Sequence, residues 1–364
     1  MPHTKPLEQP KRSLEEKLIS VGLWVDDTIP LDEAARKARD MGYNAVEIHG
    51  FGPACDPFRF HLANDDKDSP SATTIDMDAA EELAGKIADL DLVVSGFAGN
   101  FHQDGITMTT DDGAKQYFKL FKQLADYSKV MGAKMIRVDG IEPAGEMVGK
   151  NESEIIDRMG RTWAKCANYA QNQGQYITME FEPEFLGSRP SQIVAISDAV
   201  KKYASERTNM AKTWGILYDT CHGETVGIEG HKQYNRDGPL TGDARETFES
   251  QEKFITYLVT KGVNINHLHI IGSDGTLHDK KTSMHVPIRA QAGDWAEPGV
   301  DRLQYDSLLP HLLENTNLKQ NIWTVDTCFR KEGMKEAEKC LEHMREFTTQ
   351  YKSVEYKPVA PTAK

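Results

Sequence analysis

The chain has 364 residues, of which 39% are hydrophobic and 27% are charged, so it is long enough for one large globular α/β domain or two average ones. Its formal net charge of −13 argues against a nucleic acid partner, because phosphate binding favours a basic surface. The polar start has no apolar core for a signal peptide, and no apolar run is long enough to cross a bilayer. With five scattered cysteines and no CxxC pair, we expect a cytoplasmic protein with reduced thiols and no membrane partner.

Apolar runs that suit β-strands alternate with segments of helical periodicity from about residue 18 to about residue 350. The expected strands are 18–24, 45–49, 92–97, 135–139, 176–179, 215–218, 265–271 and 322–325. The expected helices are 31–41, 79–90, one that carries 117–125, 152–173, 192–205, 247–260, 303–313 and 333–348.

This alternation predicts a parallel sheet, and about eight repeats predict a closed (β/α)8 TIM barrel rather than an open doubly wound sheet. The first strand is not followed by GxGxxG, which argues against dinucleotide binding. We expect a single barrel catalytic domain over 18–350, an N-terminal arm over 1–17 and a loose tail over 351–364.

Two long irregular stretches, 222–244 and 272–302, follow the sixth and seventh expected strands. In a barrel both lie at the C-terminal face, where loops build the active site. The second is rich in histidine and charge, so we expect it to enclose a substrate, with plain surface decoration as the alternative.

Residues of metal-ligand type stand at the ends of the last four expected strands. Glu180 and Glu182 follow the fifth, Asp219 the sixth, His269 lies on the seventh, and Asp326 follows the eighth. Because parallel strand ends converge at one face of a barrel, we hypothesise that Glu180, Asp219, His269 and Asp326 share one divalent metal. Three carboxylates and one imidazole favour Mn²⁺ or Mg²⁺ over a structural zinc, although Co²⁺ and Zn²⁺ also suit such ligands.

Three motifs are similar to those of a known family. They are 179–183 (Met-Glu-Phe-Glu-Pro), 219–222 (Asp-Thr-Cys-His) and 266–269 (Asn-His-Leu-His). Over nearly its whole length the chain resembles the xylose-isomerase-like TIM-barrel superfamily of sugar isomerases and epimerases. That group also holds inosose dehydratase, lyases of keto-sugars and C-glycosides, and abasic-site endonucleases.

The resemblance implies that Glu180, Asp219 and His269 bind the metal and that His222 contacts a substrate hydroxyl. It makes Glu182 a neighbour of the site that contacts substrate, or the alternative ligand if the strand register is shifted by two. His267 has the same strand parity as His269, so it too can face inward.

One departure concerns Asp326, because epimerases of this group usually carry glutamate there. In those enzymes two glutamates exchange a carbon-bound proton from opposite faces of the substrate. Aspartate is one methylene shorter, which leaves room for an aldose–ketose isomerase or a lyase.

Other candidates lie on the earlier strands and loops. His102 is a candidate base or hydroxyl contact, or else braces its loop. His49 is a candidate substrate contact or a hydrogen-bonded core histidine, and Trp24 stacks on a sugar or packs in the core. Arg289 pairs with an acid or phosphate of the substrate, or forms a surface salt bridge.

These observations predict a metal-dependent isomerase or epimerase that removes a proton beside the carbonyl of a sugar or keto-sugar, through a metal-stabilised enediolate. Its catalytic residues are expected to be Glu180, Asp326, His102 and His222. The alternative is a lyase or dehydratase of a keto-sugar or 3-keto-glycoside, with His102 or His222 as the acid. A phosphodiesterase of the endonuclease type is less favoured because of the acidic charge balance, and homo-oligomer formation is left open.

Overall fold

The structure is a computed structural model. It describes residues 17–23, 29–49, 62–64, 73–75, 77–99, 101, 106–140, 147, 149–183, 185–276, 285–291, 300–316, 318, 321–327 and 333–351.

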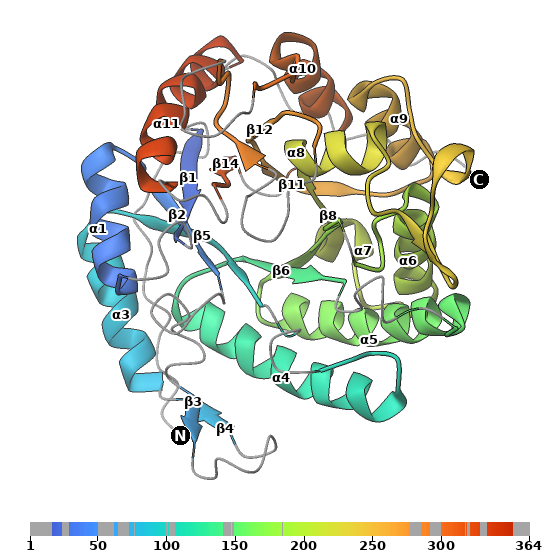
Figure 1. Ribbon diagram of the computed structural model, residues 1–364. Coiled ribbons are helices and arrows are strands. Elements are labelled where there is room, and N and C mark those ends of the chain that lie inside the picture. The colour runs from blue at the N-terminus through green and yellow to red at the C-terminus, as the bar shows by residue number, and fades with distance from the viewer. Residues whose placement is uncertain are drawn as a thin grey trace.

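Eight parallel strands form a closed barrel, as the sequence predicts (Figure 1). In ring order they are β1 (Leu18–Gly22), β14 (Ile322–Val325), β11 (Ile265–His269), β8 (Trp214–Asp219), β7 (Tyr176–Glu180), β6 (Met135–Asp139), β5 (Val93–Ala98) and β2 (Ala45–His49). The first strand, β1, pairs with both β14 and β2, which closes the ring. The strands are buried on both faces because helices cover their outer side and other strands face their inner side.

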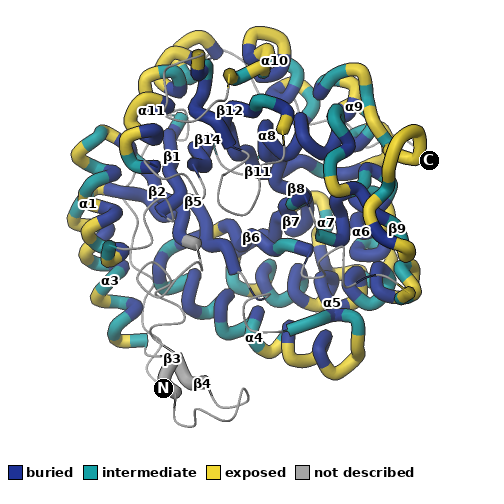
Figure 2. The backbone as a smooth tube through the Cα atoms, viewed as in Figure 1, coloured by how far each residue is buried: buried dark blue, intermediate teal, exposed yellow. Residues whose placement is uncertain are grey.

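Helices surround this barrel, with their exposed residues turned outward (Figure 2). They are α1 (Leu31–Met41), α3 (Met77–Asp89), α4 (Asp111–Val130), α5 (Glu152–Asn172), α6 (Pro190–Tyr203), α7 (Met210–Thr213), α8 (Thr220–His222), α9 (Gln251–Thr260), α10 (Tyr305–Asn315) and α11 (Gly333–Gln350). The first of them shows how the pattern works: α1 buries Leu31, Ala34, Ala35 and Ala38. This is the spacing of a single helical face, and Gly42 ends the helix at a φ of 102°.

The two stretches expected to be irregular contain short elements. The π-helix η4 (Gly223–Ile228), the strands β9 (Tyr234–Asn235) and β10 (Gly238–Pro239), and the 3₁₀-helix η5 (Gly242–Ala244) follow α8. After β11, the strands β12 (Gly272–Ser273) and β13 (His285–Val286) pair with each other. A third small pair joins β3 (Leu62–Asn64) and β4 (Thr73–Ile75).

Several element boundaries differ from the sequence prediction, for local reasons. The helix α9 begins at residue 251 rather than 247, because the Ser250 hydroxyl accepts a hydrogen bond from the Lys253 amide and caps the helix there. The helix α6 begins earlier than expected, at Pro190, since proline suits the first helical position. β1 ends at Gly22 and β11 at His269, each two residues early.

The barrel interior changes character along its axis, and this change positions the site. Four residues near the strand starts, Leu18, Ala45, Val93 and Ile322, form a separate apolar cluster. Further along, the strands carry buried polar side chains, as in the 2.8 Å contact between the hydroxyls of residues 20 and 95. The C-terminal end of the barrel is therefore the end equipped for polar chemistry.

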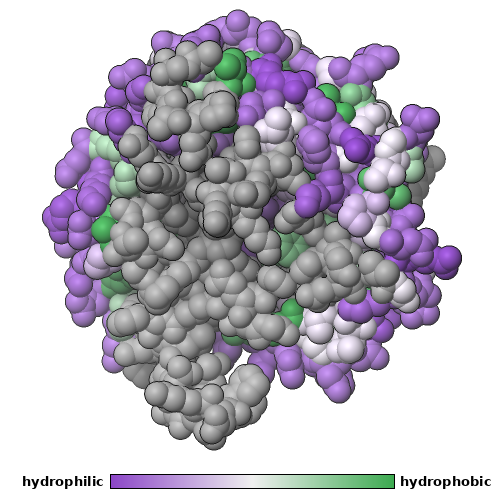
Figure 3. Space-filling view, in the orientation of Figure 1, coloured by the Kyte–Doolittle hydropathy of each residue, from purple (hydrophilic) through white to green (hydrophobic). Residues whose placement is uncertain are grey.

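The outer surface of the described residues is mostly hydrophilic in the view of Figure 3. Among those residues, Val300 is the exposed large hydrophobic side chain, at 44% exposure. Within the same part of the chain, the helices lack the combination of length and apolarity that a bilayer crossing requires.

Candidate metal centre

The four predicted ligands meet at the C-terminal ends of four neighbouring strands. Glu180, Asp219 and His269 are the last residues of β7, β8 and β11, and Asp326 directly follows β14. One donor atom from each of the four lies within 4.8 Å of the others. All four side chains are buried. The predicted convergence at the barrel mouth is therefore present in the structure.

His269 lies at the centre of this group. Its Nδ1 atom is 3.2 Å from Asp326 Oδ2, 3.4 Å from Glu180 Oε1 and 3.9 Å from Asp219 Oδ2. Its other ring nitrogen, Nε2, lies 3.1 Å from Glu47 Oε1. Burial alone would lower the pKa of His269, but the charges of Glu47 and Glu180 and the hydrogen bond with Asp326 raise this pKa well above its ordinary value.

The donor set fits a divalent cation. Oε1 of Glu180 and Oδ2 of Asp219 have no hydrogen-bond partner among the described residues, whereas Oε2 of Glu180 forms an ion pair with Arg137. Buried carboxylate oxygens without partners are rare in proteins, and three carboxylates at such short range repel one another. Oxygen and imidazole donors in this ratio match Mn²⁺, Mg²⁺, Co²⁺ or Zn²⁺.

Glu47 completes a second layer that the sequence analysis missed. It lies in β2, which β1 and β14 separate from β11 around the ring, so it meets the histidines across the barrel interior. Its Oε2 atom is 3.1 Å from both His267 Nε2 and Thr324 Oγ1. Burial opposes ionisation of Glu47, but His269 and His267 outweigh it and hold the pKa of Glu47 below its ordinary value. These contacts confirm that His267 faces inward with His269.

A buried arginine, Arg137 in β6, contacts three carboxylates. Its Nη1 is 2.5 Å from Glu180 Oε2, its Nη2 is 2.6 Å from Glu182 Oε1, and its Nε is 2.8 Å from Asp139 Oδ1. The structure therefore places Glu182 beside the four donors, held through the same guanidinium. The registers of β6 and β7 align Asp139 with Glu180. The guanidinium group of Arg137 therefore lies between the ends of these two strands.

Two imidazoles complete the polar mouth of the barrel. His222 Nδ1 is 3.6 Å from Glu180 Oε1, and His222 Nε2 is 3.4 Å from His285 Nε2. His285 Nδ1 is 3.5 Å from Asp326 Oδ1. Burial lowers the pKa of His222, whereas for His285 the charges of Asp326 and Asp219 overcome burial and raise the pKa to about 9. In the metal-free chain the pKa values of the two imidazoles therefore shift in opposite directions, and His285 is the stronger base.

His285 arrives on the β12–β13 pair, where it lies opposite Ser273. Asp301 fixes this segment, because its carboxylate accepts hydrogen bonds from the amides of residues 273, 289 and 303 and from the hydroxyl of residue 305. His285 belongs to the stretch 272–302 that is predicted from the sequence to enclose a substrate, but it is not among the predicted site residues. The long-range pairing that delivers it has no local signal.

The other predicted site residues lie outside the described residues or, in the case of Arg289, away from the cluster. Trp24 and His102 lie outside the described residues, and so does the side chain of His49, whose backbone ends β2. Arg289 lies on the outer surface, where its Nη1 is 2.9 Å from Glu346 Oε2 in α11. Its predicted alternative role, a surface salt bridge, is the one that the geometry supports.

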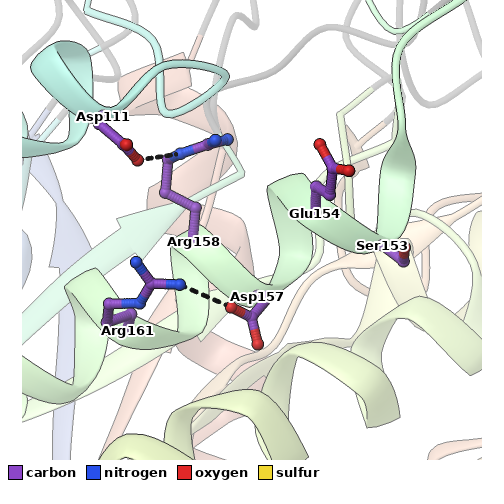
Figure 4. A pocket seen from close by; sticks show the side chains of 6 residues that line it. All are labelled: Asp111, Ser153, Glu154, Asp157, Arg158 and Arg161. Carbon is purple, nitrogen blue, oxygen red and sulfur yellow. Dashed lines mark hydrogen bonds and ion pairs between the residues drawn. The ribbon is translucent and has the colours of Figure 1, made fainter.

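A separate cavity of about 450 Å³ lies on the outside of the barrel, along α5 and the start of α4 (Figure 4). Its lining consists of Asp111, Ser153, Glu154, Asp157, Arg158 and Arg161. Both arginines in it already pair with acids, at 2.7 Å for Arg158 with Asp111 and 2.8 Å for Arg161 with Asp157. Its charges are satisfied within the chain, so the buried cluster at the barrel mouth remains the candidate site.

A family model described as xylose isomerase-like TIM barrel matches residues 35–347. The chain belongs to this family. Among solved structures, a D-tagatose 3-epimerase-like protein superposes with a TM-score of 0.59 at 17% identity, covering 92% of this chain and 98% of that one. An IOLI protein with a binding zinc atom gives 0.56 at 15% identity, covering 94% and 100%.

A third member of this fold group is the probable 3-DHS dehydratase AsbF of Bacillus anthracis. It has a TM-score of 0.57 at 13% identity and covers 90% of this chain and 98% of that one. At sequence identities of 13–17%, these structural similarities establish a shared barrel fold and nothing about the reaction. No curated protein matches the xylose isomerase-like chain in sequence.

Proposed function

We propose that this protein is a divalent-metal-dependent enzyme that removes a proton beside the carbonyl of a sugar or keto-sugar. One observation carries the proposal: Glu180, Asp219, His269 and Asp326 converge, buried, at the catalytic end of a closed barrel. The family supports it, and so do the epimerases among its structural neighbours, including an L-ribulose 3-epimerase.

A divalent cation held by these four residues would supply Lewis-acid stabilisation of negative charge on substrate oxygens. Mn²⁺ is the metal that we favour, because three of the four ligands are carboxylates. Glu180 is the candidate base, since Arg137 holds Oε2 and leaves Oε1 facing the site. Asp326 is the candidate partner on the opposite side. An epimerase needs only these two proton transfers at carbon, whereas an aldose–ketose isomerase also moves a proton between the two substrate oxygens.

A second candidate function is a lyase or dehydratase that acts on a keto-sugar or 3-keto-glycoside. The contact between His222 and His285 beside the four donors favours it, because an imidazole at the mouth of the site can deliver a proton to a departing oxygen. The same carboxylate base would serve both reactions, so the leaving group on the substrate decides between them.

The test is a panel of free, phosphorylated and 3-keto sugars, incubated with Mn²⁺ in D₂O. A product that gains deuterium but keeps all other atoms of the substrate indicates an isomerase or epimerase. Loss of a leaving group indicates a lyase. The matched control is Glu180→Gln, which should abolish exchange. Metal analysis should give about one ion per chain, compared with about three zinc ions for a nuclease of this superfamily. A protein that binds no divalent metal would contradict the proposal.

A further inference from the structure

The two ring nitrogens of His269 face different groups. The Nδ1 atom faces the three carboxylates of the metal centre, and the Nε2 atom faces Glu47 Oε1 at 3.1 Å. An imidazole can bind a cation through either nitrogen, so something must select Nδ1. The choice of nitrogen sets where the cation lies relative to Glu180 and Asp326.

We propose that Glu47 is a positioning residue that keeps a hydrogen on His269 Nε2 and so directs Nδ1 to the metal. The inference rests on the proposed role of His269 as a ligand. An ionised carboxylate has no hydrogen to donate, so the 3.1 Å contact requires that Nε2 carry the hydrogen. The Nδ1 lone pair then points at the cation.

Glu47 is itself fixed, which is what a positioning role requires. Its Oε2 atom accepts a hydrogen bond from Thr324 Oγ1 and contacts His267 Nε2, each at 3.1 Å. The carboxylate is fully buried, so water does not compete for its oxygens. With three contacts shared between its two oxygens, it has little freedom to release the imidazole.

Two substitutions separate hydrogen bonding from charge. Glu47→Gln keeps the shape but can turn its NH₂ group toward Nε2, which favours the other tautomer. Glu47→Asp keeps the charge but withdraws the oxygens by one methylene. We expect both to weaken Zn²⁺ binding by about 10- to 100-fold, the usual effect of removing a hydrogen-bond partner of a metal-ligating histidine.

The matched control is Ser20→Ala, which removes a buried hydroxyl of the barrel interior whose contact is with Ser95 and not with Glu47. It should bind Zn²⁺ with an affinity close to that of the wild type. Competition with a chromophoric chelator measures all four proteins without an activity assay, and thermal unfolding of the metal-free proteins checks that each is folded.

The wild-type protein gives a direct test of which nitrogen of His269 carries the hydrogen. In protein labelled with ¹⁵N-histidine and loaded with Zn²⁺, His269 should show a protonated Nε2 and a metal-bound Nδ1, assigned by the absence of these signals in His269→Gln. Zn²⁺ on Nε2, or unchanged affinity in both Glu47 variants, would overturn the inference while leaving the metal site in place. Failure of the wild type to bind Zn²⁺ and Mn²⁺ would instead remove the proposed function, and the inference with it.

Discussion

Arg137 Nη1 lies 2.5 Å from Glu180 Oε2, and both side chains are buried. The guanidinium occupies one carboxylate oxygen of Glu180 and leaves the other, Oε1, at 3.4 Å from His269 Nδ1. Arginine suits this role because its planar fork presents several donors in fixed directions. The ion pair with Arg137 thus fixes the orientation of the Glu180 carboxylate in the absence of a ligand.

Replacing this arginine should lower the free energy of unfolding of the protein. Arg137→Met leaves Glu180, Glu182 and Asp139 without their cation, and breaking a buried pair of this kind costs about 3–5 kcal/mol in the free energy of unfolding. Urea unfolding of the metal-free protein measures it. The matched control is Arg161→Met, whose half-exposed pair with Asp157 should cost less than about 1 kcal/mol. Equal losses in the two variants would contradict the buried network.

Asp219→Asn should remove metal binding while preserving the local fold. Asp219 caps α8 by accepting a hydrogen bond from the His222 amide at 2.8 Å, and asparagine caps helices equally well. At a metal concentration of 100 times Kd, binding stabilises the wild type by about 2.7 kcal/mol. We therefore expect Mn²⁺ to raise the wild-type Tm and EDTA to reverse it, with little response in the variant. Asp237→Asn, an exposed change, should respond like wild type, and a full shift in Asp219→Asn would count against the ligand set.

The metal-free protein should lose stability as pH rises from about 6.5 to about 9. The pKa of His285 is 6.5 in a model peptide and about 9 in the fold, so the folded state binds more protons across this window. The free energy of unfolding therefore falls as pH increases, by at most about 1.4 kcal/mol per pH unit for one group. His269 acts in the same direction.

Urea unfolding in EDTA at pH 6.5, 7.5 and 9 tests this dependence. The slope should be smaller in His285→Gln, which cannot take up the proton, than in the wild type. A wild-type stability that stays level or increases over this range, or an unchanged slope in the variant, would show that the carboxylates do not hold a proton on His285.

Asp301→Ala should loosen the β12–β13 pair without emptying the metal centre. The substitution leaves the amides of Ser273, Arg289 and Leu303 without their acceptor, at a cost of about 1–3 kcal/mol for each group that stays buried and unpaired. None of the four donors lies on this pair, so metal affinity should stay close to wild type. Hydrogen exchange at residues 272–273 and 285–286 should accelerate. The exposed Asp243→Ala is the control, and unchanged exchange in Asp301→Ala would remove its anchoring role.

The fold and the four donors could be read from the sequence because both depend on local order. Each of the last four barrel strands ends directly at or before an acid or histidine, and parallel strands bring their ends to one face. Glu47 and Arg137 were missed because they lie in the middle of apolar strands, in Ala-Val-Glu-Ile-His and Met-Ile-Arg-Val-Asp. A charge inside such a run is itself a signal of a buried polar contact, but its partner lies on another strand.

Other features had no readable signal in the chain. The pairing of β12 with β13 brings together residues separated by more than ten positions, and it determines where His285 lies. Asp301 accepts hydrogen bonds from four residues at separate positions in the chain. Its anchoring role is therefore apparent only in the folded segment. Helix starts shifted by a few residues follow from single capping contacts, such as the one at Ser250.

Ring closure has a consequence for how the protein matures in the cell. The donors come from chain positions 180, 219, 269 and 326, and β14, which supplies the last, must also join β1. A nascent chain that has emerged only as far as β11 carries three donors on an open sheet. If these four residues hold an ion as proposed, a chain truncated before β14 should therefore retain it less tightly than the closed barrel does.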